Sequence, residues 1–176
     1  MAGHNKWKQI KNQKAKTDAQ KSKVYSKYAR LIALESKLAG GVLSAPSLVA
    51  TIERAKKENV PKDVIDRAVK KGGESGGAAM ESITYEAYGP GGCAIVIEAL
   101  TENRNKAAQE VKHILSKNGF AIATPGSATW AFTRENMEWN PNMTVPLSDE
   151  DLVTLEKLVE ELEDNDEVQN VYTNAE

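Results

Sequence analysis

Residues 83–100 read ITYEAYGPGGCAIVIEAL, and this stretch decides the fold of the second half of the chain. Polar and apolar residues alternate over 83–88, which is typical of a β-strand. Residues 89–92 combine three glycines with a proline and predict a turn. The apolar run over 93–100 predicts a buried strand. Two strands joined by a tight turn therefore open the C-terminal half.

After residue 100 the sequence shows further helical and strand-like patterns. Thr101-Glu-Asn103 suits a helix start, Asn118-Gly119 a helix end, and Ser148 has capping-box spacing. The predicted elements are a helix over 104–117, strands over 128–132 and 143–147, a helix from 149 through Leu162, and a strand over 168–172. From Cys93 on, the order is βαββαβ, a ferredoxin-like arrangement with one extra strand before it.

Helical periodicity dominates the residues upstream of this domain. Apolar residues recur at three- and four-residue steps over 24–38, 48–55 and 64–69, which predicts three helices, the last two forming a short hairpin. The Gly-rich stretch 72–80 is the best linker candidate. The sequence thus predicts an α+β protein with a basic helical domain over 1–75 and an acidic α+β domain over 76–176.

The net charge of −2 hides a strong separation of charge along the chain. Residues 1–71 hold 17 Lys and Arg against 6 Asp and Glu, and residues 72–176 hold 6 against 19. The positive excess is concentrated in residues 1–30, which contain nine cations and one acid, Asp18. Such a basic segment attracts polyanions whatever the total charge. The last 29 residues carry 11 acids against Lys157 and suggest a partner surface or a means of keeping polyanions away.

The basic segment is the strongest functional signal, because its density of cations suits phosphate neutralisation. The candidate nucleic-acid-binding residues are Lys6, Trp7, Lys8, Lys11, Lys14, Lys16, Lys21, Lys23, Lys27 and Arg30. Trp7 lies among the lysines and is positioned to stack on a base, or else to pack on the helices. Lysines outnumber arginines, which favours phosphate contact over base reading and predicts weak sequence specificity.

Other functional classes find little support in the residues. The chain has no apolar run long enough for a membrane span, its first residues lack the apolar core expected of a signal peptide, and its single cysteine fits a reducing cytoplasm. Cys93, His4 and His113 lack zinc-site spacing, so we expect no metal, no cofactor and no catalytic residues. The helical hairpin favours a plain packing role over a base-reading helix-turn-helix, because Asp63 and Asp66 stand early in its second helix.

Several segments together resemble the YebC/PmpR family. They are the opening MAGHNKW with Ile10-Lys11 and Lys14-Ala15, Asn59-Val-Pro-Lys-Asp63, Tyr85-Glu-Ala-Tyr-Gly-Pro-Gly-Gly92, Glu98-Ala-Leu-Thr-Glu-Asn-Arg-Asn105, and Asp166-Glu-Val-Gln-Asn-Val-Tyr-Thr-Asn-Ala175. The family is described as probable transcriptional regulators, with mitochondrial relatives that are translational activators of cytochrome oxidase. Its members usually carry a third domain inserted between Phe132 and Trp139, and residues 133–138 are too short to hold one.

The resemblance implies a cytoplasmic, non-enzymatic regulator of gene expression. The leading prediction is a DNA-binding transcriptional regulator that contacts phosphates through its Lys-rich N-terminal arm. The first alternative is a ribosome-associated translation factor that binds ribosomal RNA. The second alternative is an interaction or self-association module that binds no nucleic acid.

Overall fold

The computed structural model describes residues 6–13, 16–74 and 80–176, which fall into two compact units. One unit is helical and covers 16–80, and the other joins residues 1–15 to the sheet region 81–176. The predicted domains 1–75 and 76–176 therefore differ from these units at the N-terminus. The reason is helix α1 (Lys6–Gln13), whose Trp7 is buried in the core of the sheet unit.

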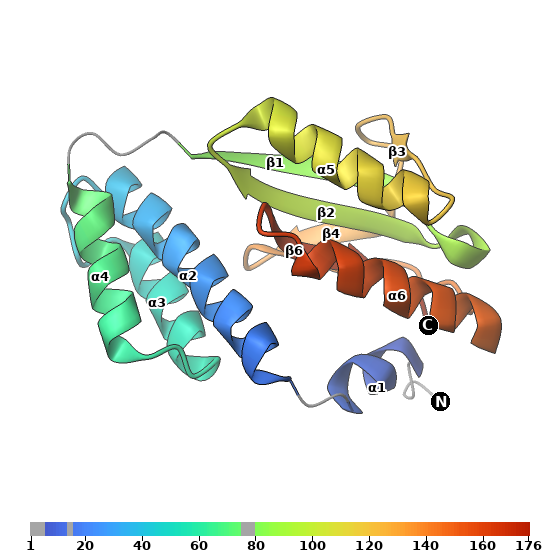
Figure 1. Cartoon of the computed structure of the whole chain (residues 1–176), viewed down its shortest axis with the longest axis horizontal. Helices are drawn as coiled ribbons and strands as arrows, with labels where there is room; N and C mark the ends of the chain where they lie inside the picture. The colour runs from blue at the N-terminus through green and yellow to red at the C-terminus, as the bar shows by residue number, and fades with distance from the viewer. Residues whose placement is uncertain (1–5, 14–15, 75–79) are drawn as a thin grey trace. The chain divides into compact units, whose positions relative to one another are not determined.

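The helical unit contains α2 (Asp18–Leu38), α3 (Pro46–Lys57) and α4 (Lys62–Gly73), which confirms the three predicted helices (Figure 1). Helix α2 begins before its apolar pattern does, because Thr17 and Gln20 form a capping box around its first turn. The core of this unit consists of buried residues from all three helices and the α3–α4 turn: Ile32, Leu48, Ala55, Val60, Ile65 and Ala68.

Helices α2 and α4 pack closely where their side chains are small. A Cβ on Gly72 would lie only 2.2 Å from the backbone oxygen of Ala33. The Ser36 hydroxyl donates to the Val69 carbonyl oxygen at 2.7 Å across the same contact. Gly72 therefore lets the backbones of α2 and α4 approach each other. It also lies near the end of α4, as the sequence predicts.

The α3–α4 turn is a Schellman motif centred on Asn59. Asn59 has φ of 60°, its N–H donates to the Lys56 carbonyl, and the Val60 N–H donates to the Ala55 carbonyl, both at 3.0 Å. Val60 is buried in the helical core, and Pro61 leads into α4. The stretch Asn59-Val-Pro-Lys-Asp63 is thus a turn of fixed geometry between two helices.

The sheet unit is built on a four-stranded antiparallel sheet. Its strands are β1 (Glu81–Tyr88), β2 (Ala94–Thr101), β3 (Ile122–Ala123) and β6 (Val168–Thr173), in the order β3-β1-β2-β6. Helices α5 (Arg104–Lys117) and α6 (Asp149–Asp164) cover one face of this sheet (Figure 1). A short 3-10 turn, η1 (Pro90–Gly92), joins β1 to β2. The α+β class and the buried strand at 93–100 are confirmed.

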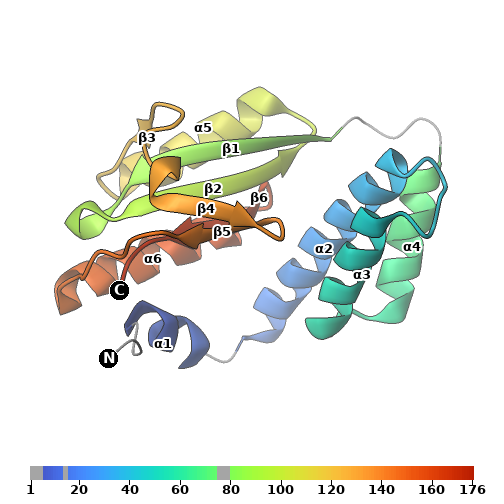
Figure 2. The ribbon, with the colours of Figure 1, turned by 180° about the vertical axis from the view of Figure 1, so that it is seen from behind.

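The other face of the sheet is covered by a β-hairpin of strands β4 (Phe132–Glu135) and β5 (Glu138–Pro141), preceded by η2 (Thr129–Ala131) (Figure 2). The ferredoxin-like order is therefore matched only in part: β2, α5, α6 and β6 lie where predicted, but the two central strands do not. Residues 128–131 form a turn, and residues 143–147 contribute a single bridge, between Val145 and Ala175. Pro146 cannot donate to a ladder, which weakens any strand there.

Glu98 on β2 fixes this hairpin to the sheet. Its carboxylate accepts hydrogen bonds from Arg134 at 3.1 Å, from the Trp139 indole at 3.1 Å and from the Asn170 amide at 3.2 Å. The Arg134 guanidinium also lies 5.1 Å from the centre of the Trp139 ring. The hairpin is thus an integral layer of the sheet unit.

Glu86 on β1 holds the loop that leads into η2. Its side chain is buried, with 5% exposed, and it accepts backbone N–H bonds from Gly126 at 2.6 Å, Ala128 at 2.9 Å and Thr129 at 2.7 Å. Burial raises the pKa of Glu86, but these hydrogen bonds together outweigh it, so the pKa lies below its usual 4.5. The ionised carboxylate therefore stabilises this part of the fold.

Replacing Glu86 with glutamine is expected to lower the free energy of unfolding at pH 7 by about 2 kcal/mol, because charge-assisted hydrogen bonds are lost. A carboxyl whose pKa falls on folding stabilises above its unfolded pKa and loses that effect as pH falls through the folded pKa. Urea unfolding should therefore show the difference between wild type and Glu86→Gln shrinking below pH 4.5. A difference that stays constant under acid would contradict this role.

Candidate nucleic-acid interface

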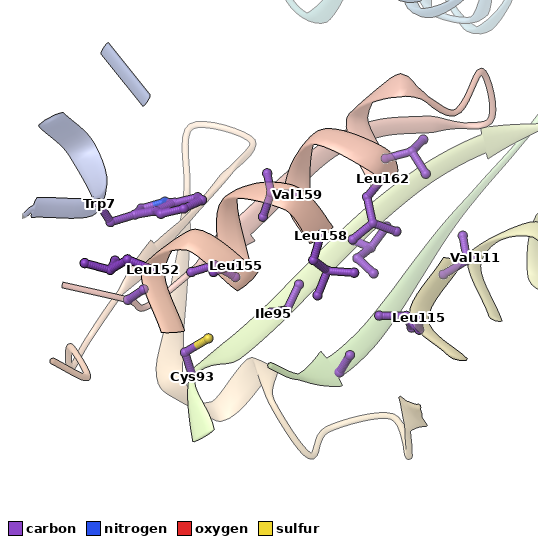
Figure 3. Close-up of a cluster of buried hydrophobic side chains, with 14 residues drawn as sticks. Trp7, Cys93, Ile95, Val111, Leu115, Leu152, Leu155, Leu158, Val159 and Leu162 are labelled. Carbon is purple, nitrogen blue, oxygen red and sulfur yellow. The ribbon is translucent and has the colours of Figure 1, made fainter. Parts of the chain in front are cut away.

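Helix α1 has one apolar side, formed by Trp7 and Ile10, and this side packs on the sheet unit. Trp7 is only 7% exposed and belongs to the same buried cluster as Leu152, Leu155 and Val159 of α6. Figure 3 shows the Trp7 ring beside the Leu152 and Leu155 side chains. The aromatic ring thus anchors the N-terminal helix to the C-terminal one.

Two lysines of α1 pair with carboxylates at opposite ends of α6. Lys6 forms an ion pair with Asp149, and Lys11 binds both carboxylate oxygens of Glu163, at 2.8 and 3.0 Å. The hydrogen bond from Lys6 lowers the pKa of Asp149. The Lys11 ammonium also lies 5.8 Å from the centre of the Trp7 ring. Each exposed pair contributes little alone, but both set the position of α1 along α6.

These contacts place part of the predicted site within the protein's own packing. Trp7 is buried against α6, and Lys6 and Lys11 pair with carboxylates of α6. Lys8 is exposed on the same helix, and Lys14 lies outside the described residues. The acidic helix, whose role the sequence left open, provides a docking surface for α1.

The other predicted cations belong to the helical unit. Lys16 precedes α2 and pairs with Glu58 at 3.1 Å. Lys23, Lys27 and Arg30 follow three- and four-residue spacing, so they share the side of α2 that faces away from the buried Ile32. Their side chains are half-exposed. They form a cationic stripe, which we call the α2 stripe.

Charge remains separated between the two units after α1 is counted with the sheet. Residues 16–80 hold 13 Lys and Arg against 7 Asp and Glu, a balance of +6. Residues 1–15 and 81–176 hold 10 against 18, a balance of −8, and together these give the net −2. The helical unit is therefore the electrostatically favoured surface for a polyanion.

A hollow of about 370 Å³ lies at one end of the helical unit. Its lining comes from the start of α2 and from the α3–α4 turn: Lys16, Lys21, Val24, Tyr25, Glu58 and Asn59. The Lys21 ammonium has no ion-pair partner within the described part of the chain. Both lysines are predictable from the sequence as cations, but Tyr25 and Asn59 are not predictable as site residues, since their proximity depends on how the helices pack.

Helix α4 lacks the surface of a base-reading helix. Its buried side, with Ile65 and Ala68, packs in the helical core. Its early exposed positions include Asp63 and Asp66, and Asp63 pairs with Arg67 at 3.1 Å. Carboxylates at these positions repel phosphates, which agrees with the expected packing role of the hairpin.

Other kinds of site find little support. Among residues 6–13, 16–74 and 80–176, no group of three or more His, Cys, Asp and Glu side chains is arranged to hold a metal ion. Cys93 is fully buried, and burial raises the pKa of its thiol. Within the same residues, no helix is long and apolar enough to cross a membrane.

Comparison with known proteins gives matches over nearly the whole chain. A family model described as "TACO1/YebC protein N-terminal domain" matches residues 5–75, and one described as "TACO1/YebC second and third domain" matches residues 80–137 and 133–175. A "probable transcriptional regulatory protein" of Fervidobacterium nodosum is 43% identical over 171 residues, covering 96% of this chain and 68% of the relative.

Two further matches span both proteins almost completely. A "probable transcriptional regulatory protein" of Caldanaerobacter subterraneus subsp. tengcongensis is 36% identical over 239 positions, covering 100% of this chain and 98% of the relative. The crystal structure of a conserved hypothetical protein from Aquifex aeolicus superposes with a TM-score of 0.81 at 29% identity, covering 97% of this chain and 96% of that one.

The comparisons also locate a missing internal segment. The alignment with the Caldanaerobacter protein has 239 positions against 176 residues here, a difference of 63. The two matched segments of the second model meet at residues 133–137, within the β4–β5 hairpin. The hairpin turns at Asn136 and Met137, with φ of 50° and 67°. A tight turn thus stands where relatives carry additional residues, as predicted between Phe132 and Trp139.

Proposed function

Because the chain belongs to the TACO1/YebC family, we propose that it is a DNA-binding regulator of transcription that contacts phosphates through its helical unit. The relatives named as probable transcriptional regulatory proteins support regulation of gene expression. In this proposal the protein has no enzymatic activity, and its partner is the nucleic-acid backbone. The helical unit takes the role that the sequence alone assigned to the N-terminal arm.

The positive balance of the helical unit carries this proposal. The unit concentrates a charge of +6 on about 65 residues, and the α2 stripe places three cations on one side of a single helix. Phosphate contacts made by lysine position a protein on nucleic acid without reading its sequence. Weak sequence preference is therefore expected.

Ribosomal RNA is a second candidate target. The acids at the start of α4 and the preference for lysine over arginine do not suit hydrogen bonding to base edges in the major groove. Recognition of RNA by its shape and charge does not need such bonds. Crosslinking the protein to nucleic acid in cells and sequencing the attached fragments distinguishes promoter DNA from ribosomal RNA as the target. Promoter DNA supports the transcription proposal, and ribosomal RNA overturns it in favour of translation.

Salt dependence tests the phosphate-binding mechanism itself. With roughly five contacts, the slope of log K against log salt on duplex DNA is expected to be about −4 to −5. Fluorescence anisotropy with a labelled duplex over a range of KCl concentrations measures it. Affinity that does not depend on salt would refute this mechanism. A salt-sensitive oligomer with no bound nucleic acid would instead indicate a self-association module.

A further inference from the structure

We propose that the hollow at the end of the helical unit binds one unpaired nucleotide, with its base against Tyr25 and its phosphate on Lys21. This inference rests on the proposed function and specifies where and how the chain of nucleic acid is held. The volume of about 370 Å³ falls within the range of roughly 300–1,000 Å³ that is common for small-ligand sites.

The lining of the hollow offers partners to the phosphate of a nucleotide and to the face and the edge of its base. Lys21 offers its ammonium group to a phosphate, and Lys16, which pairs with Glu58, lies in the same lining. Val24 and Tyr25 offer an apolar and aromatic surface to the flat base. Asn59 offers an amide that both donates and accepts hydrogen bonds at a base edge. Such a combination is more specific than a charged surface.

The fold holds the side of this site that would receive the base. Tyr25 packs against the core of the helical unit, so its ring does not need to be ordered on binding. The Schellman motif fixes the backbone of Asn59, and the Thr17–Gln20 capping box fixes the first turn of α2. A site formed in advance loses less conformational entropy when its ligand binds.

Charge around the hollow favours an incoming nucleic acid despite one carboxylate. Glu58 lies in the lining, but it pairs with Lys16 at 3.1 Å. Three further lysines are exposed just before and just after Glu58 and Asn59 in the chain: Lys56, Lys57 and Lys62. Phosphates on either side of the bound nucleotide therefore meet a net positive surface.

The site predicts a preference for single strands. In a duplex the faces of the bases are stacked on one another and are not accessible to a tyrosine ring. An unpaired base can leave its neighbours and stack on Tyr25, a contact worth about 1–3 kcal/mol by alanine substitution in other proteins. Both melted DNA and RNA supply such a base.

Anisotropy measurements with labelled single-stranded DNA, single-stranded RNA and duplex DNA test the proposal. Tyr25→Leu is expected to weaken single-strand binding roughly 5- to 150-fold, the range corresponding to lost stacking, and to leave duplex binding unchanged. Tyr25→Phe keeps the ring and should bind like wild type. Lys21→Gln should lower the salt slope on single strands by about 0.7. Lys70→Gln, an exposed lysine on α4 that does not line the hollow, is the control.

Photocrosslinking of the wild-type protein avoids any effect of substitution on folding. An oligonucleotide carrying 5-iodouracil should form its adduct at Tyr25, as read by mass spectrometry. An adduct elsewhere, or equal single-strand affinity of Tyr25→Leu and Tyr25→Phe, would overturn the site. In that case salt-dependent binding of duplex DNA would leave the proposed function standing. Adducts at Tyr25 with the RNA oligonucleotide alone would identify RNA as the source of the unpaired nucleotide. Adducts with both the DNA and the RNA oligonucleotide would show that either can supply it.

Discussion

Replacing Trp7 with alanine should lower the free energy of unfolding of the sheet unit by about 3–5 kcal/mol, the usual cost of truncating a buried aromatic side chain. Trp7 is 7% exposed and forms the main apolar contact of α1 with α6. Without the indole, α1 keeps only exposed ion pairs to hold it, and these are weak. Urea unfolding followed by the fluorescence of Trp130 and Trp139, both in the sheet unit, measures the change.

Lys8→Ala is the matched control for Trp7→Ala, because Lys8 lies on the same helix but is exposed. Its unfolding midpoint should be close to that of wild type. If Trp7→Ala also unfolds at the wild-type midpoint, α1 does not dock on α6 in solution. The N-terminal lysines would then be available to nucleic acid, as the sequence alone suggested.

Neutralising the α2 stripe in the triple variant Lys23→Gln, Lys27→Gln, Arg30→Gln should weaken duplex binding by roughly 10²–10³-fold at 0.1 M salt. Each phosphate contact contributes about 0.9 to the log–log salt slope, so losing three should reduce the slope by about 3. Anisotropy measured at several salt concentrations gives both quantities. Far-UV circular dichroism checks that the helices remain intact.

The charge-matched control for the α2 stripe lies on α1. The triple variant Lys6→Gln, Lys8→Gln, Lys11→Gln removes the same number of charges, two of which the structure pairs with Asp149 and Glu163. Its salt slope should change by less than about 1. A larger loss of slope from α1 than from the α2 stripe would return the phosphate-binding role to the N-terminal arm.

Much of the fold follows from local signals. Asn103 caps α5, Ser148 caps α6, and Gly72-Gly73 lie at the end of α4, as their residue types suggest. The apolar run that contains Ile95 and Ile97 becomes the central strand β2. These elements are predictable because capping and long apolar patterns act within a few residues.

Helix α1 was not predictable in the same way. It has eight residues, too few to be stable without a partner, and its apolar side has only Trp7 and Ile10. Its partners Asp149 and Glu163 are more than 140 residues away in sequence. The opposite charges of the two ends of the chain do not by themselves predict that these ends bind each other, because that contact depends on the fold.

The β4–β5 hairpin was misplaced for a different reason. Its turn uses Asn136 and Met137 with positive φ, whereas the strongest sequence signal for such a turn is Asn followed by Gly. The Ala128–Phe132 segment has a strand-like alternation, but Ala128 and Ala131 are both buried in a turn. Contacts with Glu98 across the sheet, rather than local pattern, set the hairpin.

The central claim is that the cations of the α2 stripe bind nucleic acid, while α1 stays docked on α6. Lysine acetylation read by mass spectrometry, with and without duplex DNA, tests this most directly. Lys23 and Lys27 should become protected when duplex DNA is added, while the reactivity of Lys6 and Lys11 should stay the same. Protection that appears at Lys6 and Lys11 but not at the α2 lysines would contradict the claim.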